Sequence, residues 1–204
     1  ISRFTKAQLE KNARVLNAIV INHGVDSLKF GGGHSCNIGV FEKIKNYQPY
    51  IISTGDVRER KGYHISIPAF AETLKKFPEL NYVIVGFKQK NDYTEKIKMV
   101  IKENGLEKKV HLLEDISDDY LEELYAHAEL FVLLPVNIGY DFEGFGLVFL
   151  EAAINSLPSI STRGNGSEDA VIDGETGLLV AQNSVKEAAE AMEKLLTDVS
   201  LRRT

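Results

Sequence analysis

The sequence predicts an α/β fold, in which a Rossmann-like, doubly wound parallel sheet of about six strands carries helices on both faces. Short apolar runs rich in β-branched residues alternate along the chain with segments of helical periodicity, and this alternation is typical of βαβ crossovers. Several runs are almost continuously apolar, as strands covered on both faces must be. Because such crossovers are right-handed, the strands are expected to lie side by side in one open sheet.

Six apolar runs are the predicted strands, and they span residues 15–21, 50–54, 81–86, 110–114, 130–136 and 158–162. Stripes of apolar side chains at helical spacing predict helices within residues 67–74, 93–104, 121–128, 147–155 and 185–192. Gly105 ends the second of these helices, and Ser184 is a suitable N-cap for the last.

One long segment, residues 22–48, follows neither pattern and contains three consecutive glycines, Gly31 to Gly33. It is too long to be a passive connection inside a compact domain. Two interpretations stay open: a mobile loop at an active site, and a surface excursion without a role.

Composition limits the classes of function. The 204 residues, 44% of them hydrophobic, suffice to bury the core of one ordinary domain. Acidic residues outnumber basic ones, 29 against 24, so no global positive field attracts nucleic acid, and any phosphate site must be local. Cys36 is the single cysteine, which excludes an internal disulfide. The sequence has no membrane span and no signal-peptide pattern, so we expect a cytoplasmic location.

A sheet of this class binds ligands beyond the carboxyl ends of its strands. The run 50–54 is followed by GDVRERKG, residues 55–62, where a glycine, several cations and a helix start favour an anion. Lys61 would add a mobile positive charge. A solvated charged turn is the alternative interpretation.

The stretch EGFGLVFLE follows the run 130–136 and places Glu143 and Glu151 on either side of a Gly-Phe-Gly turn. An acid near a helix start can merely compensate the helix dipole. Two acids around a glycine turn at the end of a strand indicate a binding role, because carboxylates are good acceptors for paired sugar hydroxyls.

The two remaining strand ends carry weaker signals. Asp115, Ser117 and Asp118 are predicted to cap the following helix and to match its dipole. The backbone of residues 111–113 is nevertheless a candidate to pair with the edge of a nucleobase, and His111 is predicted to be structural. The glycines of the turn 162–166 do not form a dinucleotide fingerprint, because Asp169 stands at the third glycine position.

Together these segments resemble the C-terminal, donor-binding half of a retaining glycosyltransferase of family 4, one of the "group 1" glycosyltransferases with the GT-B fold. The resemblance covers nearly the whole chain and is carried by INHGVDSLKF, the turn ending RKG, SDDYLEELYAHAELFVLLP, EGFGLVFLEA and GETGLLV. Its strongest element is the pair of glutamates with seven residues between them.

The resemblance implies roles for these residues. Glu151 would accept hydrogen bonds from the ribose hydroxyls of a nucleoside-diphosphate sugar, Glu143 would hold the transferred sugar, and Lys61 would neutralise the diphosphate. Glu143 and Lys61 are the implied catalytic residues. The implied donor-binding residues are Gly55, Arg58, Arg60, Lys61, Leu112, Leu113, Glu143, Phe145, Gly146, Leu147 and Glu151. The reaction would be transfer of a sugar to an acceptor hydroxyl with retention, of the hexosyltransferase type, without metal or cofactor.

One position departs from the family pattern. Asp56 stands where the family usually has arginine, and a carboxylate beside a diphosphate is repulsive unless it is paired. Arg58 and Arg60 are the candidates to supply the missing cation and to pair with Asp56.

The resemblance also predicts the domain organisation. Residues 1–14 are expected to be an interdomain linker from an N-terminal domain, and residues 15–204 the nucleotide-sugar-binding domain. The acceptor, a sugar or a lipid, would bind through that N-terminal domain, so the chain alone is expected to bind nucleotide with little or no transfer. A GT-B-like epimerase or phosphorylase half and a non-catalytic nucleotide-binding module are the alternatives.

Overall fold

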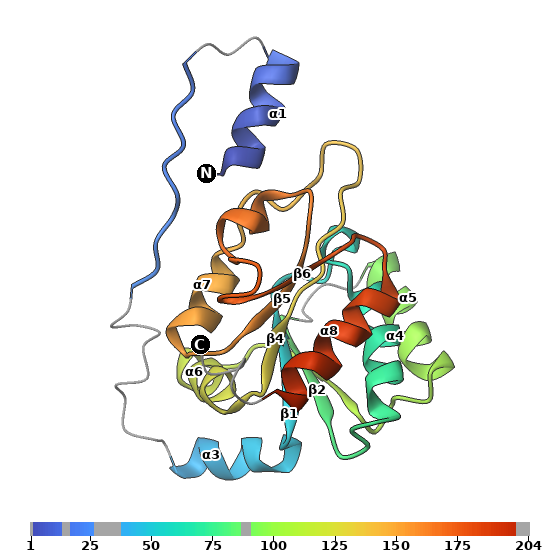
Figure 1. Cartoon of the computed structure of the whole chain (residues 1–204). Coiled ribbons are helices and arrows are strands. Elements are labelled where there is room, and N and C mark those ends of the chain that lie inside the picture. The colour runs from blue at the N-terminus through green and yellow to red at the C-terminus, as the bar shows by residue number, and fades with distance from the viewer. Residues whose placement is uncertain (1, 14–16, 27–37, 87–90, 199–204) are drawn as a thin grey trace.

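The computed structural model describes residues 2–13, 17–26, 38–86 and 91–198, and within them it contains one parallel sheet (Figure 1). The strand order is β3-β2-β1-β4-β5-β6, and every neighbouring pair is parallel. The strands are β1 Tyr50–Thr54, β2 Asn81–Val85, β3 Val110–Leu113, β4 Leu130–Val132, β5 Ser159–Thr162 and β6 Gly177–Val180. The predicted fold class is confirmed.

Helices cover both faces of this sheet, since α4, α5 and α8 lie on one side in Figure 1 and α6 and α7 on the other. The helices are α1 Arg3–Ala13, α3 Ile38–Ile44, α4 Tyr63–Leu74, α5 Asp92–Glu103, α6 Asp118–His127, α7 Leu147–Ile154 and α8 Val185–Thr197. Short 3₁₀ turns are η1 Lys45–Tyr47, η2 Glu59–Lys61 and η3 Gly166–Asp169. Two predicted N-caps are confirmed: Ser117 accepts the N–H of Tyr120, and Ser184 that of Glu187. Among the described residues, no helix is long and apolar enough to cross a bilayer.

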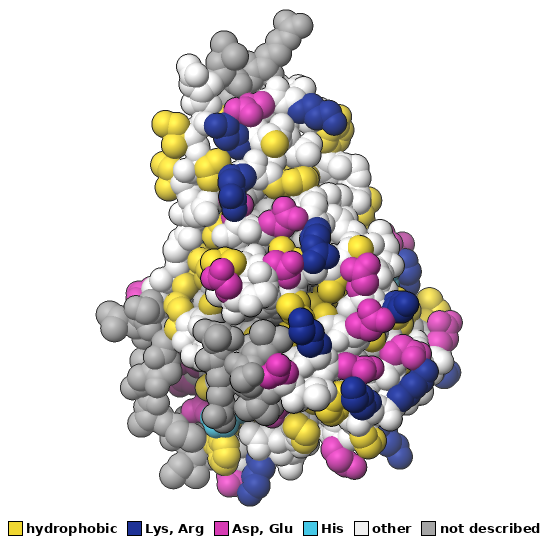
Figure 2. Space-filling view, in the orientation of Figure 1, with side chains coloured by type: hydrophobic (Ala, Val, Ile, Leu, Met, Phe, Trp, Pro, Cys, Tyr) yellow, Lys and Arg dark blue, Asp and Glu magenta, His cyan; other side chains and the backbone are white. Residues whose placement is uncertain are grey.

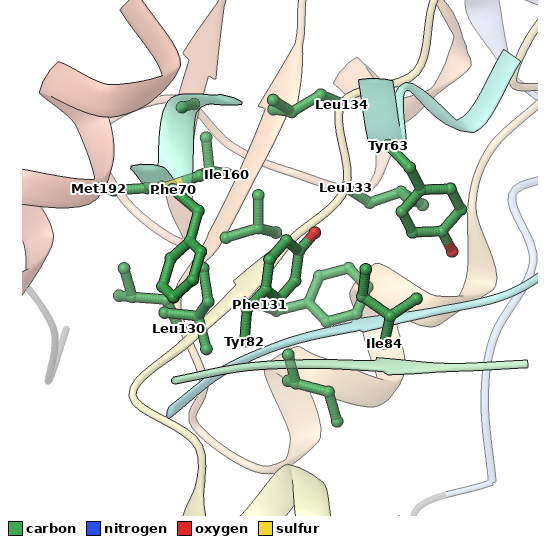
Figure 3. Close-up of a cluster of buried hydrophobic side chains, with 14 of the residues drawn as sticks. Tyr63, Phe70, Tyr82, Ile84, Leu130, Phe131, Leu133, Leu134, Ile160 and Met192 are labelled. Atoms are coloured by element: carbon green, nitrogen blue, oxygen red, sulfur yellow. The ribbon is translucent and has the colours of Figure 1, made fainter. Parts of the chain in front are cut away.

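The core lies between the sheet and these helices (Figure 3). Phe70 of α4 meets Tyr82 of β2 with 5.4 Å between ring centroids, and Phe131 of β4 meets Phe149 of α7 at 5.4 Å. All four rings are buried, and each contributes about 1.5 to 3 kcal/mol by leaving water. Since α4 and α7 cover opposite faces, both faces of the sheet are packed.

The predicted strand at 15–21 is wrong. Residues 15 and 16 lie outside the described residues, and residues 17–21 form no strand; Ile19 is 84% and Ile21 76% exposed. An apolar run indicates that a segment suits a sheet, but it does not tell whether the chain supplies a neighbour for it to pair with.

The sixth strand is β6, which lies in the segment GETGLLV and is not among the six runs predicted as strands. It escapes a pattern search because it has four residues and begins with a glycine. That glycine is required, because a Cβ on Gly177 would lie 2.0 Å from the carbonyl oxygen of Ser159 on the neighbouring strand.

The turn before β6 also covers the outer edge of the sheet. The carboxylate of Asp173 accepts the backbone N–H of Leu179 at 2.8 Å, and the N–H of Gly174 donates to the carbonyl of Gly177 at 2.8 Å. These are backbone groups that a further strand would use, so the turn protects this edge from pairing with another chain.

The segment 22–48 is partly helical, so its prediction as one irregular region is wrong. Residues 27–37 lie outside the described residues, but α3 and η1 occupy residues 38–47, with Ile44 fully buried. A seven-residue helix holds too few turns to produce a recognisable stripe in the sequence.

The strand order reverses between β1 and β4, which are neighbours in the sheet but far apart in the chain. In doubly wound folds the loops at such a switch point diverge and leave room for a ligand. Here the two loops are the segment 55–62 after β1 and the segment 133–146 after β4. Both were selected from the sequence, and the topology brings them together.

Candidate functional site

The centre of the site is an ion pair that joins the two loops at the switch point. The Nζ of Lys61, in η2, lies 2.6 Å from the Oε2 of Glu143, and the NH1 of Arg60 lies 2.9 Å from the same oxygen. Lys61 and Glu143 are only 8% and 7% exposed. Two cations therefore converge on one carboxylate in a largely desolvated place, where electrostatic interactions are stronger than in water.

Glycine and backbone hydrogen bonds bring the loops close enough for this pair. Gly62 has φ +73°, and a Cβ there would lie 1.8 Å from the carbonyl oxygen of Leu134. Two residues from this contact on each loop, the N–H of Val136 donates to the carbonyl of Arg60 at 2.8 Å. Gly55 opens the turn in a left-handed conformation, with φ +126°. A side chain at Gly62 would force the two loops apart.

The turn that carries Glu143 leads directly into α7. Gly146 is the N-cap in a left-handed conformation, φ +84°, and no side chain caps the helix. A Cβ on Gly146 would lie 2.6 Å from the ring of Phe149. Phe145 is buried, whereas Leu147 is 41% exposed. The predicted residues 145–147 thus form the N-terminus of α7, whose positive dipole end suits an anion.

A second glycine turn, at Asn165 and Gly166, packs against the turn that carries Glu143. The N–H of Gly166 donates to the carbonyl of Glu143 at 2.8 Å, and a Cβ on Gly166 would lie 2.1 Å from the carbonyl oxygen of Gly144. The amide of the fully buried Asn165 donates to the carbonyl of Thr162 and accepts the N–H of Ser167. This turn packs against the site and holds it in place.

Glu151 lies one turn inside α7 and has a different environment. The hydroxyl of the buried Tyr125 donates to its Oε2 at 2.9 Å, and the hydroxyl of Thr54 lies 2.6 Å from that of Tyr125. Thr54 is the last residue of β1 and precedes Gly55. Both glutamates are therefore linked to the carboxyl end of β1, one through Lys61 and the other through Tyr125.

Sequence reasoning missed Tyr125 as a residue of the site, because it fits an apolar helical stripe. The available signal was its hydroxyl, which must find a partner once the ring is buried. Burial, together with the nearby Glu151, raises the pKa of Tyr125 well above its usual range.

The two arginines of the first loop do different things. Arg58 pairs with Asp56 at 3.4 Å on the surface, while Arg60 contacts Asp141 at 3.2 Å as well as Glu143. Of the two candidates to pair with Asp56, Arg58 is the one that does so. Arg60 instead places its charge beside Lys61.

The remaining predicted residues lie on β3. Leu112 and Leu113 end this strand, and the carbonyl of Leu113 accepts the N–H of Gly86 at 3.0 Å. The ring of His111 packs on Tyr47 with 4.7 Å between centroids, and burial, followed by the nearby Lys109, lowers its pKa. These contacts are those of the structural histidine that was predicted.

The helix α1 lies against the glycine turn of the site. The hydroxyl of Thr5 donates to the carbonyl of Gly144 at 3.2 Å, and Phe4 packs edge-on against Phe142 with 5.0 Å between centroids. Arg3 adds an ion pair of 2.8 Å with Asp169. The N-terminal segment therefore contacts the turn that presents Glu143.

Two hollows on the described surface lie away from these charged contacts. One of 410 Å³ is bordered by β6 and α8, and one of 350 Å³ is lined by Pro49, Phe77, Leu80 and Leu196. Figure 2 shows acidic and basic side chains interspersed over one face, without an extended patch of either sign. Among the described residues, no three acidic, histidine or cysteine side chains are grouped as metal ligands. The charged contacts of Glu143 with Arg60 and Lys61 define the candidate site.

Comparison with known proteins decides the family. The family model for glycosyl transferases group 1 matches residues 39–204. The chain belongs to this family. It is 31% identical over 165 residues to the capsular polysaccharide biosynthesis glycosyltransferase CapM of Staphylococcus aureus, an alignment that covers 80% of this chain and 41% of CapM.

A second group 1 relative is the GDP-mannose-dependent alpha-(1-6)-phosphatidylinositol monomannoside mannosyltransferase of Mycolicibacterium smegmatis. It is 26% identical over 202 residues, which cover 97% of this chain and 52% of the relative. The chain thus spans about half the length of these curated relatives.

Solved structures agree with the family. A glycosyltransferase from Rickettsia africae superposes with a TM-score of 0.86 at 19% identity, covering all of this chain and 54% of the other. The C-terminal domain of the group 1 protein LpcC from Francisella tularensis gives 0.73 at 26% identity, covering 88% and 91%. The fold is that of one half of a GT-B glycosyltransferase, as predicted.

Proposed function

We propose that this chain binds a nucleoside-diphosphate sugar and forms the donor-binding half of a retaining glycosyltransferase. The observation that carries the proposal is the convergence of Lys61 and Arg60 on Glu143 at the switch point of the sheet. Glu151, eight residues further on, is tied to the same end of β1 through Tyr125 and Thr54. Family membership supports the same reading.

In the proposed complex, Lys61 and Arg60 offset the charge of the diphosphate, and the N-terminus of α7 adds its backbone N–H groups. Glu143 accepts hydrogen bonds from hydroxyls of the transferred sugar, and Glu151 from those of the ribose. The bond between the anomeric carbon and the diphosphate breaks while the acceptor oxygen bonds to that carbon on the same face. The protein then acts mainly by stabilising the leaving diphosphate.

The backbone at the end of β3, Leu112 and Leu113, remains the proposed contact for the nucleobase. Arg58 is engaged with Asp56 at the surface, which makes the turn after β1 less repulsive toward a diphosphate. We propose no metal and no cofactor for this half, because Lys61 and Arg60 already supply cations at the diphosphate position.

The names of similar proteins support a nucleotide-sugar donor. The mycobacterial relative is described as GDP-mannose-dependent. The structure of Anabaena HepE, which contains UDP and glucose, has a TM-score of 0.76 with this chain at 21% identity, covering 91% of this chain and 49% of HepE. Since this chain spans about half of its relatives, we propose that residues outside it bind the acceptor, a sugar or a lipid, and that transfer requires them.

Titration calorimetry with UDP, GDP and ADP tests the proposal. One nucleotide should bind in preference to the others, and Glu151→Gln should weaken that binding about tenfold. Glu72→Gln is the matched control, because Glu72 is paired with Lys75 on the surface of α4. Absence of binding by all three nucleotides would favour a non-catalytic remnant, and conversion of a nucleotide-sugar to its epimer would favour an epimerase half.

A further inference from the structure

A line of buried hydroxyl groups connects the end of β1 to Glu151. The hydroxyl oxygens of Thr54 and Tyr125 are 2.6 Å apart, and the hydroxyl of Tyr125 donates to the Oε2 of Glu151 at 2.9 Å. Thr54 is 4% exposed and Tyr125 is fully buried. The three groups come from three different elements, β1, α6 and α7, so the line ties two helices on one face of the sheet to the carboxyl end of β1.

The hydrogen atoms along this line have a defined direction. A tyrosine hydroxyl carries one hydrogen, and that of Tyr125 is donated to Glu151. The hydroxyl of Thr54 must therefore donate to the oxygen of Tyr125. Burial, with Glu151 nearby, raises the pKa of Tyr125, so its hydrogen stays in place at neutral pH. Bonds that run in one direction polarise and strengthen one another.

We propose that Tyr125 is a positioning residue, which holds the Glu151 carboxylate in the orientation that accepts the two ribose hydroxyls of the donor. The chain would in this way distinguish a ribonucleotide from its 2′-deoxy counterpart. The inference rests on the proposed function, because it assigns the ribose to Glu151. It adds the residue that makes this carboxylate a fixed acceptor.

Fixing the carboxylate has a physical advantage. A glutamate on a helix surface samples several rotamers, and ordering such a side chain on binding costs about 0.5 to 1.5 kcal/mol. The bond from Tyr125 imposes that order before the ligand arrives. A carboxylate has two oxygens with about four acceptor positions in all, so one bond can orient the group without making it unfit as an acceptor.

The line also links the ribose end of the site to the diphosphate end. Thr54 is followed by Gly55, whose carbonyl accepts the hydroxyl of Tyr63 at 3.1 Å. Gly55 begins the turn that carries Lys61, and a Cβ on it would lie 3.9 Å from the Lys61 Nζ. A nucleotide with its diphosphate at Lys61 and its ribose at Glu151 would therefore bind one group that lies beside Gly55 and one that is connected through Tyr125 to Thr54, the preceding residue.

Tyr82 provides a matched comparison within the same core. It is also a fully buried tyrosine, and its hydroxyl lies 2.6 Å from that of Ser53 and 2.9 Å from that of Ser66. No glutamate is among these partners. Removing its hydroxyl should cost stability in the same way as at Tyr125, but it should leave recognition of ribose unchanged.

The experiment measures binding of the preferred nucleoside diphosphate and of its 2′-deoxy counterpart by titration calorimetry. The variants are Tyr125→Phe, Thr54→Val, Glu151→Gln and Tyr82→Phe. For Tyr125→Phe we expect binding of the ribonucleotide to weaken about tenfold, which corresponds to about 1.4 kcal/mol, while binding of the deoxynucleotide changes less than about twofold. Thr54→Val should act in the same direction but more weakly, and Tyr82→Phe should preserve the ratio of the two affinities.

The outcomes separate this inference from the function on which it rests. If Glu151→Gln abolishes the preference for ribose but Tyr125→Phe and Thr54→Val keep it, Tyr125 has only a structural role and the inference is overturned. If the unaltered chain binds no nucleoside diphosphate, the proposed function itself is wrong. Should Tyr125→Phe fail to fold, Thr54→Val decides the question, because an unchanged ratio in that variant contradicts the proposed line of hydrogen bonds.

Discussion

Lys61 and Glu143 satisfy each other's charge in this structure, with 2.6 Å between Nζ and Oε2. In the proposed complex, however, Lys61 faces the diphosphate and Glu143 the transferred sugar. An arriving diphosphate must therefore compete with the Glu143 carboxylate for Lys61. Because of this competition, we expect the Glu143 carboxylate to weaken binding of the bare diphosphate although it belongs to the binding site.

We predict that Glu143→Gln binds the bare nucleoside diphosphate at least as tightly as the unaltered chain, because the competing negative charge is gone. The preference for the nucleotide-sugar over the bare nucleotide should fall about tenfold, since one charged hydrogen bond to the sugar, worth about 1.5 to 3 kcal/mol, is weakened. Calorimetry with both ligands measures the ratio. Glu72→Gln is the control, because Glu72 is paired with Lys75 on the surface of α4; weaker binding of the bare nucleotide by Glu143→Gln would contradict the idea.

Replacing the lysine should have the opposite effect. We predict that Lys61→Ala weakens binding of the nucleoside diphosphate by about 10- to 100-fold, the loss expected for one charge-assisted contact. Arg60 still compensates Glu143, so the protein should remain folded. The control is Lys75→Ala, which removes an exposed lysine paired with Glu72 at 2.5 Å. Equal affinities for the two variants would remove Lys61 from the proposed site.

The glycine turn behind the site offers a test of architecture. The φ of Gly166 lies outside the left-handed range, so the cost of Gly166→Ala comes from contact: its Cβ would lie 2.1 Å from the carbonyl oxygen of Gly144. We predict a loss of about 2 to 4 kcal/mol in the free energy of unfolding, within the range of severe steric substitutions. Gly24→Ala, where no atom lies within 4 Å of the added Cβ, should change it by less than about 0.5 kcal/mol. Urea denaturation of both variants provides the comparison.

The strands of the sheet could be predicted where each one is a continuous apolar run in the sequence. The runs at 50–54, 81–86 and 110–114 match β1, β2 and β3 to within one residue; β1 and β2 are almost entirely buried, and the edge strand β3 is partly buried. The run at 130–136 was too long, because β4 ends at Val132 and the N–H of Leu133 makes the last bond to β5, although Leu133 and Leu134 remain buried. An apolar run in the sequence indicates burial, whereas the residue at which strand pairing ends depends on the neighbouring strand.

The site was predictable in location and composition but not in its contacts. The switch-point argument places residues 55–62 and Glu143 at one edge of the sheet, yet the ion pair joins residues 82 positions apart. It depends on the close approach at Gly62 and Leu134, which no spacing reveals. Tyr125 was hidden for another reason, because a buried aromatic ring and a positioned hydroxyl look the same in a helical stripe.

His64 makes stability depend on pH in a way that can be worked out from its contacts. The hydroxyl of Tyr93 accepts the backbone N–H of His64 at 3.2 Å and lies 2.8 Å from its Nδ1. In a neutral ring that carries its hydrogen on Nε2, Nδ1 can accept the hydrogen of this hydroxyl. Burial first, and then the nearby Lys96, lower the pKa of His64. Protonation of Nδ1 would break that bond.

The unfolded chain, in which a histidine titrates at about 6.5, therefore binds more protons than the folded one as the pH falls. We predict that this histidine lowers the free energy of unfolding progressively below about pH 6.5 and has no such effect above it. Urea denaturation at pH 7.5 and 5.5 should give a smaller pH dependence for His64→Asn than for the unaltered chain. An imidazole resonance of His64 that titrates at or above its unfolded value would show that the sign is wrong.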